Sequence, residues 1–208
     1  KTIEPYLPLL KTVLKSTDPG TLKWGLDSLR NLAASIADNL PDPRVRRETE
    51  LATDPYQSKI KLLLFGTTVK SLDSLTPSVE PALRSNDPET RTLAHKTVEA
   101  IANARRLARL TSQYEPTPGN TLLPVSKDDY LLPGLQTLLP TLYGNLKSAD
   151  PVLRLRAMEA LEFYETAIWP DRGQVIAAPR DPSPFVRWVA ARALGKRIPK
   201  KPEHPAQS

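Results

Sequence analysis

The amino-acid sequence predicts an all-α chain built as an array of antiparallel helix pairs. The hexapeptide Leu-[Lys/Arg]-Ser-x-Asp-Pro occurs three times, at residues 14–19, 83–88 and 146–151. Apolar residues recur at helical spacing on both sides of each copy. Hydrophobic residues make up 39% of the 208 residues and charged residues 25%, which suits a packed core rather than a disordered chain. Internal repetition on this scale indicates stacked units and not a single globular core.

The residues before each hexapeptide predict a short amphipathic helix. A proline lies ten residues before the Asp of each copy, an apolar residue lies eight before it, and the invariant Leu lies four before it. A proline in or near the first turn, followed by apolar residues four apart, is typical of such a helix. The prolines are Pro8, Pro77 and Pro140.

The Asp-Pro pair of each hexapeptide is predicted to begin a second helix. An Asp side chain can act as N-cap by accepting a backbone N–H, and Pro suits the first helical position. A looser fourth copy of the pair follows the same pattern with two residues inserted. The structural residues of the repeat are therefore Asp18, Pro19, Asp87, Pro88, Asp150, Pro151, Asp181 and Pro182.

The residues after each Asp-Pro predict one buried face on the second helix. Seven residues after the Asp the side chain is always small: Gly25, Ala94 or Ala157. Eleven and fourteen residues after it the side chain is large and mostly aliphatic, and these three offsets fall on one helical face. A small residue there would let the neighbouring helix approach closely. Each unit is thus predicted to be helix, tight turn, helix.

The residues after the fourth copy resemble the second helix of a HEAT repeat. They read Val-Arg-x-x-Ala-x-x-Ala-Leu-Gly over 186–195, and residues 154–161 and 91–94 look similar. The resemblance covers about residues 3–38, 75–110 and 130–197. It implies a HEAT-like right-handed α-α superhelix, with about four to five helix pairs in a single domain over 1–198. The Pro- and Lys-rich residues 199–208 are predicted to form a flexible tail.

The same resemblance implies a role for three arginines that lie three residues before the small residue of their repeats. In HEAT-like arrays an Arg at this place pairs with an Asp of an adjacent repeat. Arg91, Arg154 and Arg187 are therefore expected to pair with Asp87, Asp150 or Asp181. Direct contact with a ligand is the alternative role.

The spacing of the copies departs from that of an ordinary repeat. Asp18 and Asp87 are 69 residues apart and Asp87 and Asp150 are 63 apart, against about 40 for an ordinary repeat. The extra lengths are Pro-rich insertions at 40–56 and 115–130, with a third linker at 169–173. They are either tolerated surface insertions or functional loops. A further helix predicted over 58–72 either begins a long first helix bent at Pro77 or forms half of a degenerate hairpin.

The residue composition excludes several kinds of catalytic and metal-binding site. The chain has no Cys and two His, so it lacks disulfides, thiolate nucleophiles and Cys-ligated zinc. Ser58-Lys59-Ile60-Lys61 matches Ser-x-x-Lys, which is common by chance, and no complete catalytic motif accompanies it. We expect no enzymatic activity and no cofactor. No apolar run is long enough to span a bilayer. The chain starts at Lys1 without Met, so a lost targeting or anchor segment stays open, and a cytoplasmic location is favoured.

The leading functional prediction is a non-enzymatic scaffold or adaptor that binds a protein through its concave face or its Pro-rich loop edge. Trp24 and Trp188 are expected in the core between repeats, whereas Trp169 lies in a linker and is expected to be exposed. Arg105, Arg106 and Arg109 either complement the end of a long helix or form a basic ridge. The candidate partner-binding residues are Trp169, Arg105, Arg106, Arg109, Tyr56 and Tyr130.

The alternative prediction is a basic HEAT-like nucleic-acid-binding module. The net charge is +6, and residues 154–201 hold ten Lys or Arg against five Asp or Glu. Such a bias permits contact with nucleic acid but selects no partner. Only 6% of residues are aromatic, so the chain offers few platforms for stacking bases.

Overall fold

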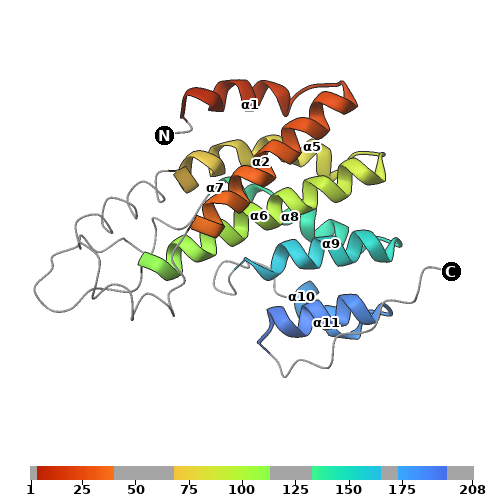
Figure 1. Cartoon of the computed structure of the whole chain (residues 1–208). Helices are drawn as coiled ribbons and strands as arrows, with labels where there is room; N and C mark the ends of the chain where they lie inside the picture. Colours follow the sequence, from red (N-terminus) through yellow and green to blue (C-terminus); the bar gives the residue numbers. More distant parts are fainter. Residues whose placement is uncertain (1–3, 40–67, 113–132, 165–172, 196–208) are drawn as a thin grey trace, which may run out of the picture. The chain divides into compact units, whose positions relative to one another are not determined.

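A computed structural model describes residues 4–39, 68–112, 133–164 and 173–195 of the chain. They belong to two compact units, Lys1–Leu138 and Leu139–Ser208. Within the described ranges the chain forms helices and turns and no strand, so the all-α prediction is confirmed there (Figure 1).

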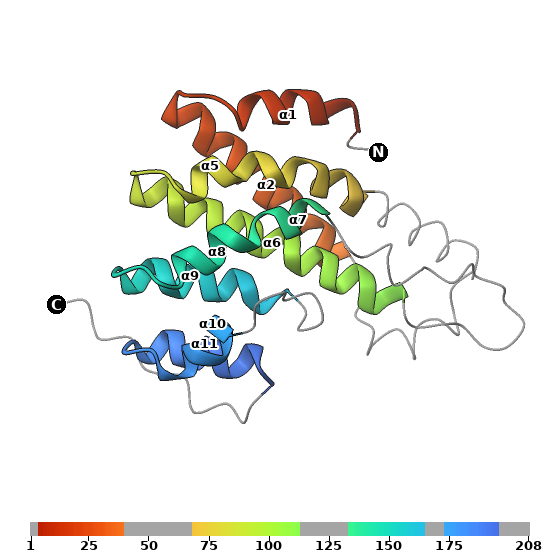
Figure 2. The same cartoon turned by 180° about the vertical axis from the view of Figure 1, so that it is seen from behind.

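The described residues of the first unit form two helix pairs followed by a short helix. Its second helices, α2 and α6, lie side by side, as both views show (Figures 1 and 2). α1 packs against α2, α5 against α6, and α7 against η2. The elements are η1 (Glu4–Tyr6), α1 (Leu7–Val13), α2 (Pro19–Asn39), helical residues 68–75, η2 (Thr76–Val79), α5 (Glu80–Leu83), α6 (Pro88–Ser112) and α7 (Pro133–Thr137).

The second unit repeats this arrangement on a smaller scale. α8 packs against α9, α9 packs along α11, and α11 also contacts η5. Leu142, Met158, Leu161 and Val186 are among the side chains that fill its core. The elements are α8 (Leu139–Asn145), α9 (Pro151–Glu162), α10 (Gly173–Ala177), η5 (Ala178–Arg180) and α11 (Pro184–Ala193).

The predicted prolines lie at the start of helical segments. Pro8 and Pro140 are the second residues of α1 and α8, and Pro77 is the second residue of η2. Because proline lacks an N–H and its ring crowds the carbonyl four residues earlier, a regular helix is interrupted at such a residue. Residues 68–83 continue as helix, 3-10 turn and helix through Pro77. Residues 58–67 of the helix predicted over 58–72 lie outside the described residues, so the two interpretations of that helix stay as predictions.

The predicted small residues are buried on the second helices. Ala94 and Ala157 have no exposed surface. Gly25 is also buried, and a Cβ built on it would lie 2.5 Å from Cγ1 of Val13 in α1. The absence of a side chain at Gly25 therefore permits the close approach of α1 to α2, as the repeat pattern predicts.

Candidate functional site

The three hexapeptides form the same turn. In each copy the Ser Oγ accepts a hydrogen bond from the backbone N–H of the Asp two residues later, at 3.1–3.2 Å. The Asp carboxylate in turn accepts from a backbone N–H in the first turn of the helix that follows. The donors are Thr21 to Asp18 (2.7 Å), Thr90 to Asp87 (3.1 Å) and Val152 to Asp150 (2.8 Å). The Asp residues are N-caps and the helices begin at Pro19, Pro88 and Pro151, as predicted.

The fourth copy has the predicted insertion of two residues, which lies between its Asp-Pro pair and the helix. α11 begins at Pro184 with Ser183 as its N-cap residue, so Asp181 and Pro182 precede the helix by two residues more than the other Asp-Pro pairs do. Asp181 Oδ1 accepts from the N–H of Ser183 at 2.8 Å, as the Ser of the other copies does with its Asp. Asp and Ser side chains can both accept a hydrogen bond from the amide two residues ahead. In this copy Asp181 therefore takes the position that Ser has in the other copies, and Ser183 takes the position of their Asp.

The arginines confirm this register. Arg154 Nη1 donates to the carbonyl oxygens of Ser148 and Ala149, six and five residues earlier, at 2.9 and 3.0 Å. Arg187 Nη1 donates to the carbonyl oxygens of Asp181 and Pro182, again six and five residues earlier, both at 2.9 Å. Asp181 therefore occupies the place of Ser148.

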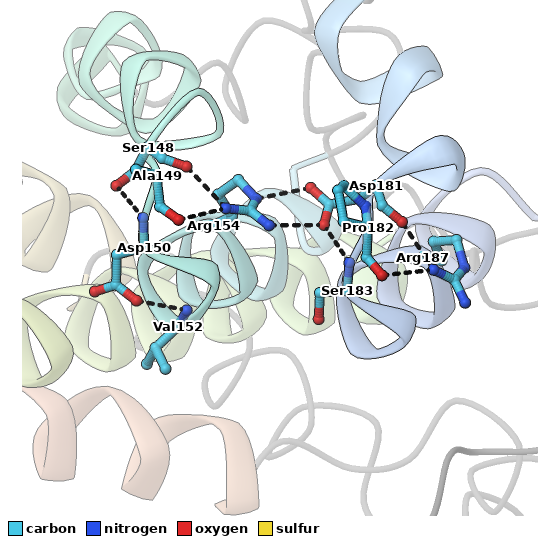
Figure 3. A network of polar contacts seen from close by, with 9 residues as sticks. All are labelled: Ser148, Ala149, Asp150, Val152, Arg154, Asp181, Pro182, Ser183 and Arg187. Carbon is cyan, nitrogen blue, oxygen red and sulfur yellow. Dashed lines mark hydrogen bonds and ion pairs between the residues drawn. The ribbon is translucent and has the colours of Figure 1, made fainter.

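An Arg–Asp pair joins the two turns of the second unit (Figure 3). Arg154 Nε lies 2.8 Å from Asp181 Oδ2, and its Nη2 lies 3.0 Å from Oδ1. The two side chains are only 13% and 11% exposed. Together with the bonds to Ser148 and Ala149, one guanidinium holds the turn before α9 against the turn before α11. The predicted pairing between adjacent repeats is confirmed for Arg154 and Asp181.

The electrostatic environment keeps this pair ionised. Burial raises the pKa of Asp181, but the hydrogen bonds from Arg154 and the Ser183 amide and the charges of Arg154 and Arg187 outweigh it, so the pKa lies below 3.8. The hydrogen bond to Asp181 raises the pKa of Arg154. A carboxylate that is charged at neutral pH and accepts hydrogen bonds at both oxygens is suited to holding two turns together and not to acid–base chemistry.

Arg91 and Arg187 do not form the predicted Asp pairs within the described residues of their units. Arg91 Nη1 donates to the carbonyl oxygen of Ser85 at 2.7 Å, and Arg187 bonds to backbone carbonyls. In the first unit, Lys23 of α2 links the two repeats instead. Its Nζ lies 3.0 Å from Asp87 Oδ2 and also bonds to Glu89.

Asp87 predicts a pH dependence for the first unit. The Thr90 hydroxyl, the Lys23 ammonium and the Thr90 amide hold the pKa of Asp87 below its usual 3.8. Its contribution to stability is therefore full above pH 3.8 and is lost as the pH falls below it. We expect the urea midpoint of the wild type to drop as the pH is lowered from about 4 to about 2, and that of Asp87→Asn to drop less.

The matched control is Asp38→Asn, which changes an exposed carboxylate in the last turn of α2. It should follow the wild-type profile. A profile for Asp87→Asn that parallels the wild type would show that the cap and the Lys23 pair contribute nothing through charge.

The predicted basic ridge on α6 is not formed as expected. Arg105 is only 5% exposed, and its charge partly opposes the rise in pKa that burial gives Asp73. α6 continues to Ser112, so Arg105 lies about two turns before its end, beyond the reach of the helix dipole. Arg106 is exposed on the same helix, and the side chain of Arg109 lies outside the described part of the chain.

Asp73 is a structural residue that the sequence pattern does not single out. Its carboxylate accepts hydrogen bonds from the backbone N–H groups of Gly134 (2.8 Å) and Leu135 (2.9 Å), 61 and 62 residues away. Burial raises its pKa against the effect of these bonds and of Arg105. Its position between Leu72 and Leu75, on the apolar face of residues 68–75, is the signal that could have identified it.

One of the two tryptophans expected in the core differs from the prediction. Trp24 was expected in the core but is 57% exposed, because the buried face of α2 runs through Gly25, Leu26 and Leu29. Trp188 is half-buried, and the guanidinium carbon of Arg192 lies 4.3 Å from the centre of its ring. Trp169, Tyr56 and Tyr130 lie outside the described residues, as do the insertions at 40–56 and 115–130 and the tail.

The basic residues of the second unit are largely engaged within it. Arg154 pairs with Asp181, Arg156 with Glu159 at 2.7 Å, and Arg192 with Glu162. In the parts of the chain that the structure describes, no group of acidic residues and histidines could hold a metal ion. The helices described there are all too short or too polar to cross a membrane.

Comparison of the whole chain with protein-family models finds no match, and comparison with curated proteins finds none either.

Proposed function

We propose that this chain is a HEAT-like repeat scaffold that binds a protein partner and carries out no catalysis itself. Two features of the helix pairs support the proposal. Within each unit the second helices pack along one another, α2 along α6 and α9 along α11, as stacked repeats would. The polar side chains of the turns are used in caps and in the links between repeats. The repeated residues thus have a structural role, and we assign partner binding to exposed side chains of the helix pairs.

The observation that carries the proposal is the exposure of Trp24. A tryptophan that is 57% exposed leaves a large apolar surface in water, and such residues are typical anchors of protein interfaces. Tyr6, at the end of η1, and Leu9, in α1, are also exposed, at 63% and 58%. A protein partner suits the chain better than a nucleic acid, because Arg154, Arg156 and Arg192 of the second unit are committed to carboxylates.

Trp24→Ser tests the proposal. We expect it to lower the capture of the partner about tenfold or more, since exposed Trp anchors are often worth 2 kcal/mol. The full chain is used as bait in the source cell, and the captured proteins are quantified by mass spectrometry.

Val152→Ser is the matched control, because Val152 is also a large apolar residue, 52% exposed, on a helix of the other unit. It should leave capture unchanged. Circular dichroism melting should be the same for all three proteins. Equal capture by Trp24→Ser and the wild type would exclude Trp24 as an anchor.

A further inference from the structure

A groove of about 300 Å³ opens at the turns of the second unit. The end of the α8 hairpin, η5 and the first turn of α11 contribute its walls. Its volume is at the lower end of that of ligand sites, which suits one large side chain of an extended segment rather than a cofactor. The residues that matter for its chemistry are Leu146, Lys147, Ala178, Arg180, Asp181 and Val186.

The groove is lined by both apolar and cationic side chains. Leu146, Ala178 and Val186 are the apolar ones, and the side chains of Lys147 and Arg180 are exposed. Among the described residues of the lining the carboxylate is that of Asp181, which is neutralised by its two-bond pair with Arg154. The cationic side chains of this lining are those of Lys147 and Arg180.

We infer that this groove binds an acidic peptide segment of a protein partner. One apolar side chain of the segment would lie against Leu146 and Val186, and carboxylates on either side of it would lie beside Lys147 and Arg180. Charge complementarity supports this occupant. A nucleic acid fits less well, because two cations among apolar side chains give too few phosphate contacts for a backbone that relies on many.

The inference rests on the proposed function, since it names the chemistry of a bound protein. It involves a different unit from Trp24 and different residues, so the two can fail separately. The chain's own tail is a poor occupant, because residues 196–208 carry Lys196, Arg197, Lys200 and Lys201 against Glu203.

The experiment is a selection of displayed random peptides on the full chain, followed by affinity measurement. We expect enrichment of peptides in which acidic residues flank Leu, Ile or Phe. The defined probe is fluorescein-labelled Glu-Asp-Leu-Phe-Asp-Glu, whose binding is followed by fluorescence polarisation. The double variant Lys147→Glu/Arg180→Glu should weaken the probe at least about tenfold, or 1.4 kcal/mol. Both side chains are exposed, so the fold should persist, which circular dichroism checks.

A matched control exists in the first hexapeptide. Lys15 is exposed and occupies the same place in its turn as Lys147 does. Lys15→Glu removes the same charge far along the sequence and should change the probe affinity less than twofold. A probe with Ala-Ala in place of Leu-Phe should bind about fivefold more weakly, because it lacks the apolar side chains.

Three results would overturn the inference. The first is no enrichment of acidic peptides, and the second is equal weakening of the probe by Lys15→Glu and by the double variant. The third is displacement of the probe by inorganic phosphate or a single-stranded oligonucleotide at the concentrations at which unlabelled peptide competes. Trp24→Ser should leave the probe affinity unchanged. If the probe binds as predicted but Trp24→Ser captures partner proteins as well as the wild type does, the groove inference is supported and Trp24 is excluded as an anchor.

Discussion

Replacing Gly134 with alanine is expected to lower the free energy of unfolding of the first unit by about 3 kcal/mol. A Cβ at this position would overlap the backbone oxygen of Asp73 and lie 2.8 Å from its Oδ1. The backbone oxygen belongs to helical residues 68–75 and cannot turn aside as a flexible side chain can. Moving α7 away would break the hydrogen bonds from the Gly134 and Leu135 amides to the buried Asp73 carboxylate.

Hydrogen exchange followed by mass spectrometry measures this effect, because peptides from α6 and α9 report on the two units separately. Exchange of α6 amides should speed up in Gly134→Ala.

Gly144→Ala is the control for Gly134→Ala. Gly144 lies near the end of α8, and a Cβ there would meet no atom within 4 Å. Alanine at a helical position without a clash is expected to be neutral or to stabilise by up to about 1 kcal/mol. If the two substitutions had the same effect on exchange, the close approach of Asp73 to Gly134 would be refuted.

The start of each second helix could be predicted because its cause is local. A cap needs one side-chain oxygen and an amide two or three residues ahead, so Asp18, Asp87 and Asp150 specify their turns with no help from the rest of the fold. The buried face of each second helix follows from periodicity in the same way. Gly25 and the alanines at its place are buried for this reason.

The fourth turn shows how far local reasoning reaches. Asp181-Pro182 and Ser183-Pro184 are both acceptable starts for a helix by residue type, and the sequence predicts two inserted residues without saying which pair begins the helix. The choice between them depends on Arg154, which binds Asp181 from 27 residues away. Once Asp181 faces that guanidinium, Ser183 is left to begin α11. A tertiary contact therefore decides the register of this turn.

The residues of the candidate sites were harder to predict for the same reason. The bond from Gly134 to Asp73 joins segments 61 residues apart, and no motif marks either residue. Trp24 is exposed because the packing of α2 uses the face one residue further along the helix. The groove near Lys147 and Arg180 exists only when the turns of α8 and α11 are brought together. By contrast, the pair of Arg154 and Asp181 was expected from the resemblance to HEAT repeats.

Arg154→Ala is expected to lower the free energy of unfolding of the second unit by about 2–4 kcal/mol. The guanidinium donates to both Asp181 oxygens and to the carbonyls of Ser148 and Ala149. Its removal leaves a mostly buried carboxylate with only the Ser183 amide, and the breaking of one partner of such a pair costs more than the pair contributes. The figure extends below the range of about 3–5 kcal/mol for buried pairs because the side chains remain 13% and 11% exposed. Exchange of α9 and α11 amides measures the loss.

The loss should depend on pH. Asp181 in the wild type has a pKa below 3.8, so its paired charge stabilises the unit fully above that pH and progressively less below it. Without Arg154, burial acts with less opposition and the pKa rises. The difference between wild type and Arg154→Ala should therefore shrink as the pH is lowered from about 5 to 3.

Two further variants separate the bidentate pair from a general effect of charge. Arg187 occupies the same place on α11 but is exposed, and among the described residues its hydrogen bonds go to the carbonyls of Asp181 and Pro182. Arg187→Ala is therefore expected to cost about 0.5–1.5 kcal/mol. Arg154→Lys keeps the charge but cannot make two parallel bonds to one carboxylate, so it should fall between Arg154→Ala and the wild type. Equal losses for Arg154→Ala and Arg187→Ala would mean that the link between the two turns does not hold this unit together.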